Sequence, residues 1–260
     1  MTKYIQMKRF NFKFVNKYCH NVWTFSLIMT IMVSYSCNQN EKSFKSFYFP
    51  FEKLKKGLVY KYESLNGKPP EYWMYFSKEK DGQLFFRSVN VTPSGKRIQE
   101  VIEKEISNGI KMMEYNIFQY DSTGRQMTQA LEISSPASFS YAIKDTANIF
   151  IFKAKLEDPF DPNIITTITK NKKFGGYGTF KFNNQEVPII KIDITELIEQ
   201  EKKDDGFLEP PSYHGVEWYA KGIGLVYYKK EINENFIMEY QLKKIMTKAE
   251  FELMNAKDEK

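Results

Sequence analysis

Residues 57–91, GLVYKYESLNGKPPEYWMYFSKEKDGQLFFRSVNV, form the stretch that decides the fold class. Aromatic and β-branched residues alternate with polar ones in three segments of it, which is the pattern of strands that bury one face. The breaks contain Asn66-Gly67 and Asp81-Gly82, pairs that suit tight hairpin turns because both central residues of such turns need positive φ. The stretch therefore predicts three antiparallel strands joined by hairpins. The three segments are 57–64, 71–78 and 83–91.

The same pattern continues to residue 246 and predicts roughly twelve strands in all. Residues 96–107 fit a helical face and also alternate strand positions, and Asn108-Gly109 after them favours a hairpin. From Cys37 onward the chain holds 34 aromatic residues and eight alanines, a composition that favours sheet over helix. We therefore expect an all-β fold, an antiparallel meander that forms a half-barrel, a barrel-like sheet or a sandwich. The remaining strands are expected near 110–120, 125–133, 148–156, 164–173, 178–182, 185–196, 215–220, 224–231 and 236–246.

Two segments between these strands are expected to interrupt the sheet. The glycine-rich Phe174–Gly178, FGGYG, predicts a hairpin or a bulge. The charged Glu199–Asp205, EQEKKDD, predicts a solvated surface loop. Near the C-terminus, Thr247 and Glu250 have the spacing of a capping box, which predicts a short helix.

The first 36 residues carry most of the surplus of positive charge. The formal charge of the chain is +6, but residues 1–36 hold five basic residues and no acidic one, which leaves the remainder near +1. The part of the chain after residue 36, which we call the body, is so close to neutral that it is not expected to bind nucleic acid. Residues 1–21 are basic and residues 22–36 are apolar, and that apolar run is too short to span a hydrocarbon core of about 30 Å. We interpret 1–36 as a signal peptide, with translation starting at Met1 or Met7.

Ser34-Tyr35-Ser36-Cys37 follows the apolar run and resembles the lipobox of bacterial lipoproteins. The resemblance implies cleavage before Cys37, which becomes the site of lipid attachment. Two alternatives stay open. Ser34 and Ser36 also fit an ordinary signal-peptidase site, which would leave Cys37 as a free N-terminal residue, and the segment could be an uncleaved anchor. Because Cys19 lies in the signal peptide, one cysteine remains and no intrachain disulfide is expected.

The chain is thus expected to have four consecutive parts. These are a signal peptide, a lipidated tether whose aromatic end docks onto the body, one antiparallel β domain, and a short C-terminal helix with its tail. Their expected bounds are 1–36, 37–56, 57–246 and 247–260.

Residues 216–231, VEWYAKGIGLVYYKKE, resemble the closing hairpin of uncharacterised envelope lipoproteins of Gram-negative bacteria. In those proteins a curved antiparallel sheet forms a half-barrel like that of lipoprotein carriers. The resemblance implies a fold and supplies no catalytic residue, and carrier function does not follow from a fold.

Few residues of the chain suit catalysis or metal binding. His214 is the one histidine after residue 36, and no Gly-x-Ser-x-Gly motif supplies a nucleophile, so we interpret it as a loop histidine. One histidine and one cysteine do not make the usual ligand sets for zinc. Asp158 and Asp161 each precede a proline and are interpreted as turn residues, although calcium ligation is the alternative. We predict no catalytic residue, no metal site and no cofactor.

Aromatic side chains are the remaining candidates for binding. Trp73, Tyr75, Trp218 and Tyr219 lie on predicted strands, and rings with a polar edge suit sugar stacking or the walls of an apolar pocket. The same rings could instead fill the core of the sheet. We keep these four as candidate ligand-binding residues.

Two classes of function are compatible with the sequence. The first is a non-enzymatic exported protein, held on a membrane by N-terminal acyl chains, that binds a partner protein or an apolar ligand. Asn38 follows Cys37 where the best-known sorting systems use aspartate to retain lipoproteins at the inner membrane, so the outer membrane is expected. The alternative is an enzyme or accessory protein acting on envelope polysaccharide or peptidoglycan, which would need a carboxylate pair that the sequence does not single out.

Overall fold

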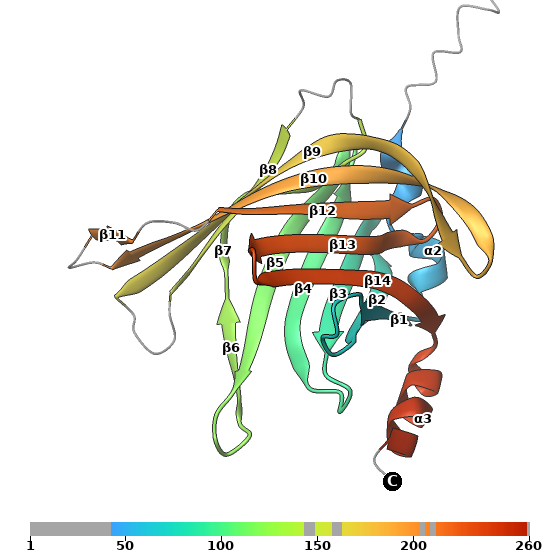
Figure 1. Ribbon diagram of the computed structural model, residues 1–260, viewed down its shortest axis with the longest axis horizontal. Coiled ribbons are helices and arrows are strands. Elements are labelled where there is room, and N and C mark those ends of the chain that lie inside the picture. The colour runs from blue at the N-terminus through green and yellow to red at the C-terminus, as the bar shows by residue number, and fades with distance from the viewer. Residues whose placement is uncertain (1–42, 143–148, 158–162, 203–205, 209–211, 259–260) are drawn as a thin grey trace, which may run out of the picture. The chain divides into compact units, whose positions relative to one another are not determined.

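The computed structural model describes residues 43–142, 149–157, 163–202, 206–208 and 212–258. Within these ranges the chain forms one antiparallel sheet of fourteen strands, together with three short helices (Figure 1). The predicted all-β fold is confirmed. The strands are β1 (Leu58–Ser64), β2 (Glu71–Lys80), β3 (Gln83–Val91), β4 (Arg97–Ile106), β5 (Gly109–Tyr120), β6 (Gln126–Ala130), β7 (Glu132–Ser140), β8 (Ile149–Glu157), β9 (Ile164–Phe182), β10 (Gln185–Lys202), β11 (Gly206–Leu208), β12 (Ser212–Ala220), β13 (Gly224–Asn233) and β14 (Phe236–Met246).

The sheet closes into a ring. β10 pairs with β12 on one side and with β9 on the other, so that β1–β5, β7–β10 and β12–β14 form a barrel of twelve strands. β6 pairs with β5, and β11 pairs with β10, outside this ring. Of the three sheet forms that the sequence left open, the structure has the barrel.

β9 is one strand of nineteen residues where the sequence predicted two, 164–173 and 178–182. On β10, Lys191 pairs with Gly176 of β9 and the next residue, Ile192, pairs with Phe174. Gly175 is skipped, and it is therefore the extra residue of a bulge. A Cβ atom at Gly175 would lie 2.7 Å from a carboxylate oxygen of Asp193, which explains why glycine occupies the position. The glycine-rich segment is therefore a bulge and not a hairpin.

The surface loop predicted over 199–205 is wrong for its first four residues. Residues 199–202 belong to β10, where they pair with residues 164–167 of β9. The long neighbouring strand supplies backbone partners, and these outweigh the polarity of the side chains. Residues 203–205 lie outside the described residues.

The strand predicted over 125–133 is also corrected, because β6 and β7 divide this region. β7 was not predicted from its sequence, EISSPASFS, which is poor in the usual strand residues. Pro136 lies within β7 opposite Phe152 of β8, so its missing N–H falls inside a continuous sheet.

A barrel of twelve strands is wider than its own side chains fill, since about eight strands already give an interior that side chains just occupy. At one end the space is taken by residues 44–54, which we call the plug. The plug forms the 3-10 helix η1 (Phe44–Phe47) and the short helix α2 (Phe51–Leu54). Its buried side chains are Phe44, Tyr48, Phe49 and Leu54. The aromatic end of the segment predicted over 37–56 was expected to dock onto the body, and in the structure the chain is part of the core from residue 44.

The plug contacts opposite walls of the barrel. The ring of Tyr48 lies within 6.4 Å, between centroids, of aromatic rings on β3, β7 and β12. Two backbone hydrogen bonds hold η1 to the barrel, from Phe44 N to Tyr141 O at 2.9 Å and from Gly222 N to Ser46 O at 2.8 Å. We call this end of the barrel the plug end and the opposite end the far end. The plug end includes the β2–β3, β4–β5, β9–β10 and β12–β13 turns.

The predicted C-terminal helix is present as α3 (Lys248–Asp258), which lies against the outer wall (Figure 1). The capping box forms as predicted: Glu250 N–H donates to the Thr247 hydroxyl at 3.2 Å, and Thr247 N–H donates to the Glu250 carboxylate at 2.7 Å. Phe251 is buried in a second apolar cluster outside the barrel. The other buried members of this cluster are Val59, Tyr72, Val89, Val91 and Met246. Among the described residues, no helix is long and apolar enough to cross a membrane.

We predict that Gly224→Ala destabilises the domain far more than Gly124→Ala. Both glycines have positive φ, +100° and +81°, so both substitutions pay a similar backbone cost of about 1 kcal/mol. A Cβ at Gly224 would also lie 2.5 Å from the buried ring of Phe49, whereas the space around Gly124 is open. We expect losses of about 3 kcal/mol and about 1 kcal/mol in the free energy of unfolding, measured by urea denaturation. Equal losses would contradict the packing of the plug against the β12–β13 turn.

Candidate functional site

The four aromatic candidates divide between the two faces of the barrel. Trp73 and Tyr75 lie two residues apart on β2, with rings nearly parallel at 6.2 Å, and face the interior. Tyr219 on β12 also faces the interior, where its ring lies near Tyr48 of the plug. Trp218, the preceding residue, faces outward, with its ring 4.2 Å from that of Tyr227.

Tyr75 and Tyr219 are built into the core. Tyr75 is buried between Phe49 of the plug at 4.4 Å and Tyr60 at 4.8 Å. Tyr219 is buried as well, and its hydroxyl donates to Glu217 Oε2 at 2.8 Å. Trp73 is partly exposed, and its indole N–H donates to a carboxylate at 3.2 Å. A ligand role for these rings stays a prediction, with Trp73 the most accessible of the three inner ones.

A chain of polar contacts crosses the barrel interior beside the plug. The buried carboxylate of Glu103, on β4, accepts hydrogen bonds from the hydroxyls of Tyr48, at 2.6 Å, and of Ser138 on β7. Lys172 on β9 donates to the Ser138 carbonyl at 3.4 Å and to Glu217 on β12 at 3.1 Å. β4 and β12 lie six strands apart in the ring of twelve, so this chain connects opposite walls.

A second charged cluster lies on the inner wall nearer the far end. Glu196 on β10 binds Lys170 on β9 at 3.2 Å and Lys230 on β13 at 2.7 Å. The ammonium group of Lys230 also lies 4.7 Å from the centre of the Tyr213 ring. The side chains of Lys170 and Lys230 are 32% and 31% exposed, so solvent reaches the inner wall here.

The environments of the three inner carboxyl groups shift their pKa values in opposite directions. Burial raises the pKa of Glu103, and the hydrogen bonds from Ser138 and Tyr48 offset this only in part. Burial also acts to raise the pKa of Glu217, but Lys172 and Lys170 outweigh it and the pKa is lowered. The pKa of Glu196 is lowered in the same way by Lys170 and Lys230. Lysines therefore favour the charged form of Glu196 and Glu217, whereas burial favours the neutral form of Glu103.

Sequence reasoning missed these charged residues because it did not assign inward and outward positions. Lys170 and Lys172 alternate along β9, which places both on one face of the strand. Glu196 on β10 is directly opposite Lys170, and Glu217 lies two strands away from Lys172. The signal that could have found them is a pair of lysines at alternate positions of a strand that has apolar residues on the same face.

The structure offers no support for metal or histidine chemistry among the described residues. No group of three or more His, Cys, Asp or Glu side chains there could hold a metal ion. His214 is exposed on β12, opposite Thr195 and Glu231, and so lies on a strand and not in the predicted loop. Cys37, Asp158 and Asp161 lie outside the described residues.

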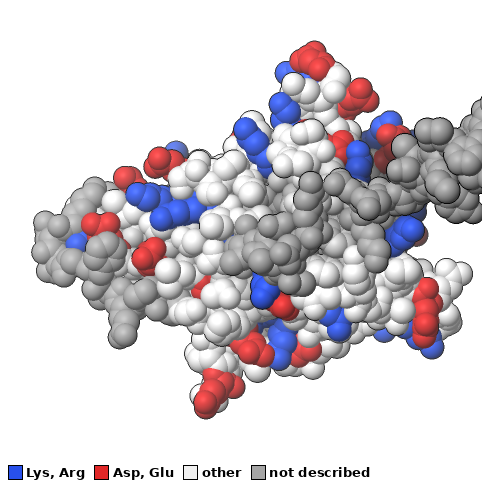
Figure 2. Space-filling view, turned by 90° about the horizontal axis from the view of Figure 1, so that it is seen from above, with Lys and Arg blue, Asp and Glu red and all other residues white. Residues whose placement is uncertain are grey.

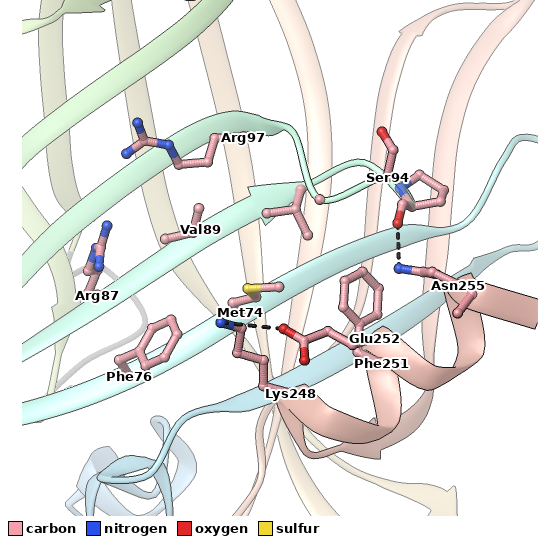
Figure 3. A pocket seen from close by; sticks show the side chains of 14 residues that line it. Met74, Phe76, Arg87, Val89, Ser94, Arg97, Lys248, Phe251, Glu252 and Asn255 are labelled. Carbon is pink, nitrogen blue, oxygen red and sulfur yellow. Dashed lines mark hydrogen bonds and ion pairs between the residues drawn. The ribbon is translucent and has the colours of Figure 1, made fainter. Parts of the chain in front are cut away.

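A groove of about 530 Å³ lies on the outer wall, between α3 and strands β2–β4 (Figure 3). Its floor is formed by apolar side chains. The floor residues are Met74, Val89, Val91 and Phe251. At the edge of the groove, Asn255 of α3 is hydrogen-bonded to the carbonyl of Pro93 in the β3–β4 turn. The groove exists because α3 packs on the wall mainly through Phe251 and Met254, which leaves the rest of the contact open.

Two arginines of the sheet line this groove (Figure 3). Arg87 on β3 is bound by the carboxylate of Glu100, which neutralises its charge. Arg97 on β4 donates to the Gln126 amide oxygen at 3.2 Å and lies 4.3 Å above the Phe118 ring. Among the described residues Arg97 makes no ion pair, so the groove combines an apolar floor with one uncompensated positive charge.

Elsewhere on the wall, charges of both signs are mixed. Figure 2 shows lysine, arginine and carboxylate side chains interspersed over the described part of the face that it displays. Charge is thus not gathered into one basic surface on that face.

No model of a known protein family and no curated protein matches the chain. Three solved structures are similar to it. A "putative lipoprotein" from Parabacteroides distasonis has 15% identity and a TM-score of 0.49, over 75% of this chain and 95% of that one. A "putative exported protein with YmcC-like fold" from Bacteroides fragilis has 14% identity and a TM-score of 0.49, over 76% and 98%. The "hypothetical lipoprotein YmcC" from Escherichia coli has 8% identity and a TM-score of 0.32, over 75% and 88%. Function is therefore argued from the chain's own residues.

We predict opposite pH dependences for the variants Glu217→Gln and Glu103→Gln. The pKa of Glu217 is lowered from 4.5 by folding, so its carboxylate stabilises the fold above that pH and the contribution is lost as the pH falls further. Glu217→Gln should lower the free energy of unfolding by about 2 kcal/mol at neutral pH and by less in acid. The pKa of Glu103 is raised from 4.5, so wild-type stability falls as the pH rises through the raised pKa. Glu103→Gln cannot ionise and lacks that loss, so its free energy of unfolding relative to wild type should rise between acid and neutral pH.

Urea unfolding at about pH 4 and about pH 7 measures both effects. A larger cost for Glu103→Gln at neutral pH than in acid would show that Glu103 is a stabilising carboxylate, and would contradict the burial effect described above.

Proposed function

We propose that the chain is an exported, lipid-anchored envelope protein without enzymatic activity, and that it binds an apolar ligand with an acidic group in the groove beneath α3. The groove is the observation that carries the ligand proposal. Its size falls within the range of small-molecule sites, and its lining combines an apolar floor with charged and polar side chains, which suits a ligand with an apolar part and an acidic group. Arg97 supplies a guanidinium whose charge no carboxylate of the described residues matches.

The inner wall supports the non-enzymatic part of the proposal. The carboxyl groups of Glu103, Glu196 and Glu217 are each bound by a hydroxyl or a lysine of the protein itself. Bound in this way, they are engaged in connecting strands of the barrel and are poorly placed to act as a free acid and base on a substrate.

The lipid anchor rests on Cys37 and on the signal-like segment before it. Two or three acyl chains hold a protein on a membrane far more firmly than one chain does. The outer membrane is the proposed location, on the ground that Asn38 and not aspartate follows Cys37.

We predict that wild-type protein incorporates labelled palmitate and stays with membranes in high salt, because the near-neutral body adds little electrostatic attraction. Cys37→Ser should lose the label and be either released or retained with an uncleaved signal. Cys19→Ser is the matched control and should keep the label, since Cys19 leaves with the signal peptide. Unlabelled soluble wild-type protein that begins at Cys37 would show cleavage by ordinary signal peptidase and refute the anchor.

The groove is tested with a fluorescent long-chain fatty acid and the corresponding alcohol. We predict that Arg97→Gln weakens binding of the acid roughly tenfold and leaves binding of the alcohol unchanged, because a hydrogen bond to a charged group is lost in the first case alone.

Two tryptophan variants on α3 control for the location of the site. Ala256→Trp places a ring in the groove and should block both probes, whereas Leu253→Trp changes a position that is 65% exposed and should not. Undiminished binding to Ala256→Trp would place the ligand elsewhere.

A further inference from the structure

The described domain begins at the plug end. Ser43 forms a β-bridge with Ala142, and Phe44 is buried against Phe174 with ring centroids 5.1 Å apart. The chain therefore enters the folded domain at a fixed point. This point lies at the end of the barrel where α2 and the β12–β13 turn meet (Figure 1).

The proposed anchor is close to this point along the chain. Five residues separate Cys37 from Ser43, and six Cα–Cα steps span at most about 20 Å even when fully extended. A wall strand such as β2, with ten residues, is about 33 Å long. An anchor at Cys37 thus keeps the plug end near the lipid headgroups, and it cannot reach along the whole wall to the far end.

The plug end carries more exposed lysines than exposed carboxylates. Among the described residues there are seven of the former and four of the latter. The lysines are Lys45, Lys53, Lys55, Lys56, Lys80, Lys181 and Lys221. The carboxylates are Glu52, Glu79, Asp81 and Glu186. Lys53, Lys56 and Lys221 make no ion pair with any described residue, so their charge is free to act on a partner.

An exposed aromatic ring lies at the same end. Tyr177 is 52% exposed, and its ring lies against Phe44 at 6.0 Å and Phe174 at 5.0 Å. Tyrosine is enriched at the level of lipid headgroups because its ring is apolar and its hydroxyl is polar. Lysines near a membrane surface are attracted by acidic lipids. Positive charge, an interfacial ring and the shortness of the tether therefore coincide at one end of the barrel.

We propose that the plug end is a membrane-binding face that contacts acidic phospholipid headgroups and orients the anchored domain with its far end away from the bilayer. The inference rests on the lipid anchor proposed above, and it adds the face and the lipid class. The lysines that carry it are Lys53, Lys56 and Lys221.

The test uses the full chain, acylated in cells and reconstituted into vesicles of phosphatidylcholine with phosphatidylglycerol. Ser46→Cys at the plug end and Ser122→Cys at the far end each add one free thiol at an exposed position. Each thiol is labelled with a fluorophore, and lipid-borne quenchers report its distance from the bilayer. We expect quenching at position 46 to be at least about threefold stronger than at position 122.

Charge reversal separates headgroup binding from tethering. Lys53, Lys56 and Lys221 changed together to Glu should lower the quenching at position 46 about twofold or more on acidic vesicles. The matched control changes the exposed far-end residues Lys96, Arg125 and Lys155 to Glu and should have no such effect. Vesicles of phosphatidylcholine alone should abolish the difference between the two triple variants.

Equal quenching at the two positions, or equal effects of the two triple variants, would overturn the orientation while leaving a palmitate-labelled anchor intact. A chain without the palmitate label would instead refute the anchor, and this inference with it.

Discussion

The width of a twelve-strand ring is the constraint on which the rest of this structure depends. Interior side chains fill a barrel of about eight strands, and a wider ring leaves space that must be occupied or solvated. Here apolar bulk from the plug occupies one end, where Phe44, Tyr48, Phe49 and Leu54 are buried among rings of the surrounding strands. Charged and aromatic side chains line the other part, where lysines remain about a third exposed. The plug thus separates a packed end from an end that water reaches.

Ion pairs inside the barrel follow from this division. Removing charges from water is costly, and the cost is offset when geometry is good and further hydrogen bonds satisfy the remaining groups. Glu217 has Lys172 and the Tyr219 hydroxyl, and Glu196 has two lysines. Lys170 lies on the strand next to that of Glu196, but Lys172 and Lys230 each bind a carboxylate two strands away in the ring. These two longer pairs connect strands that backbone hydrogen bonds do not join directly.

The outer wall shows what a single short helix can do for such a barrel. α3 covers apolar side chains of β1–β3 and β14 with few residues of its own, Phe251 above all. A longer or better-packed helix would close the groove, and without the helix its floor would be an exposed apolar patch. Because α3 is short and contacts the sheet through few residues, one side of the groove belongs to the sheet and the other to a helix that is held at a few points. The groove lies on the outer wall beneath α3, whereas the surplus of lysines lies around the plug end. The proposed ligand site and the proposed membrane-binding face are therefore separate surfaces.

The sequence by itself determined most of the strands and the C-terminal helix, because alternation of apolar and polar residues and the Asn-Gly and Asp-Gly turns are local signals. β1 to β3 agree with the predicted segments within two residues, and the capping box of α3 is formed as its spacing predicts. Tertiary structure alone decided the closure of the sheet, since the pairing of β9 with β10 and β10 with β12 depends on strand length and bulges. The sequence predicted that the aromatic end of the tether docks onto the body, and tertiary structure decided that it does so inside the barrel, where there was space to fill. Lys170, Lys172, Glu196, Glu217 and Lys230 look like ordinary surface residues in the sequence, and they became an inner-wall cluster because closure of the ring turned one face of every strand inward.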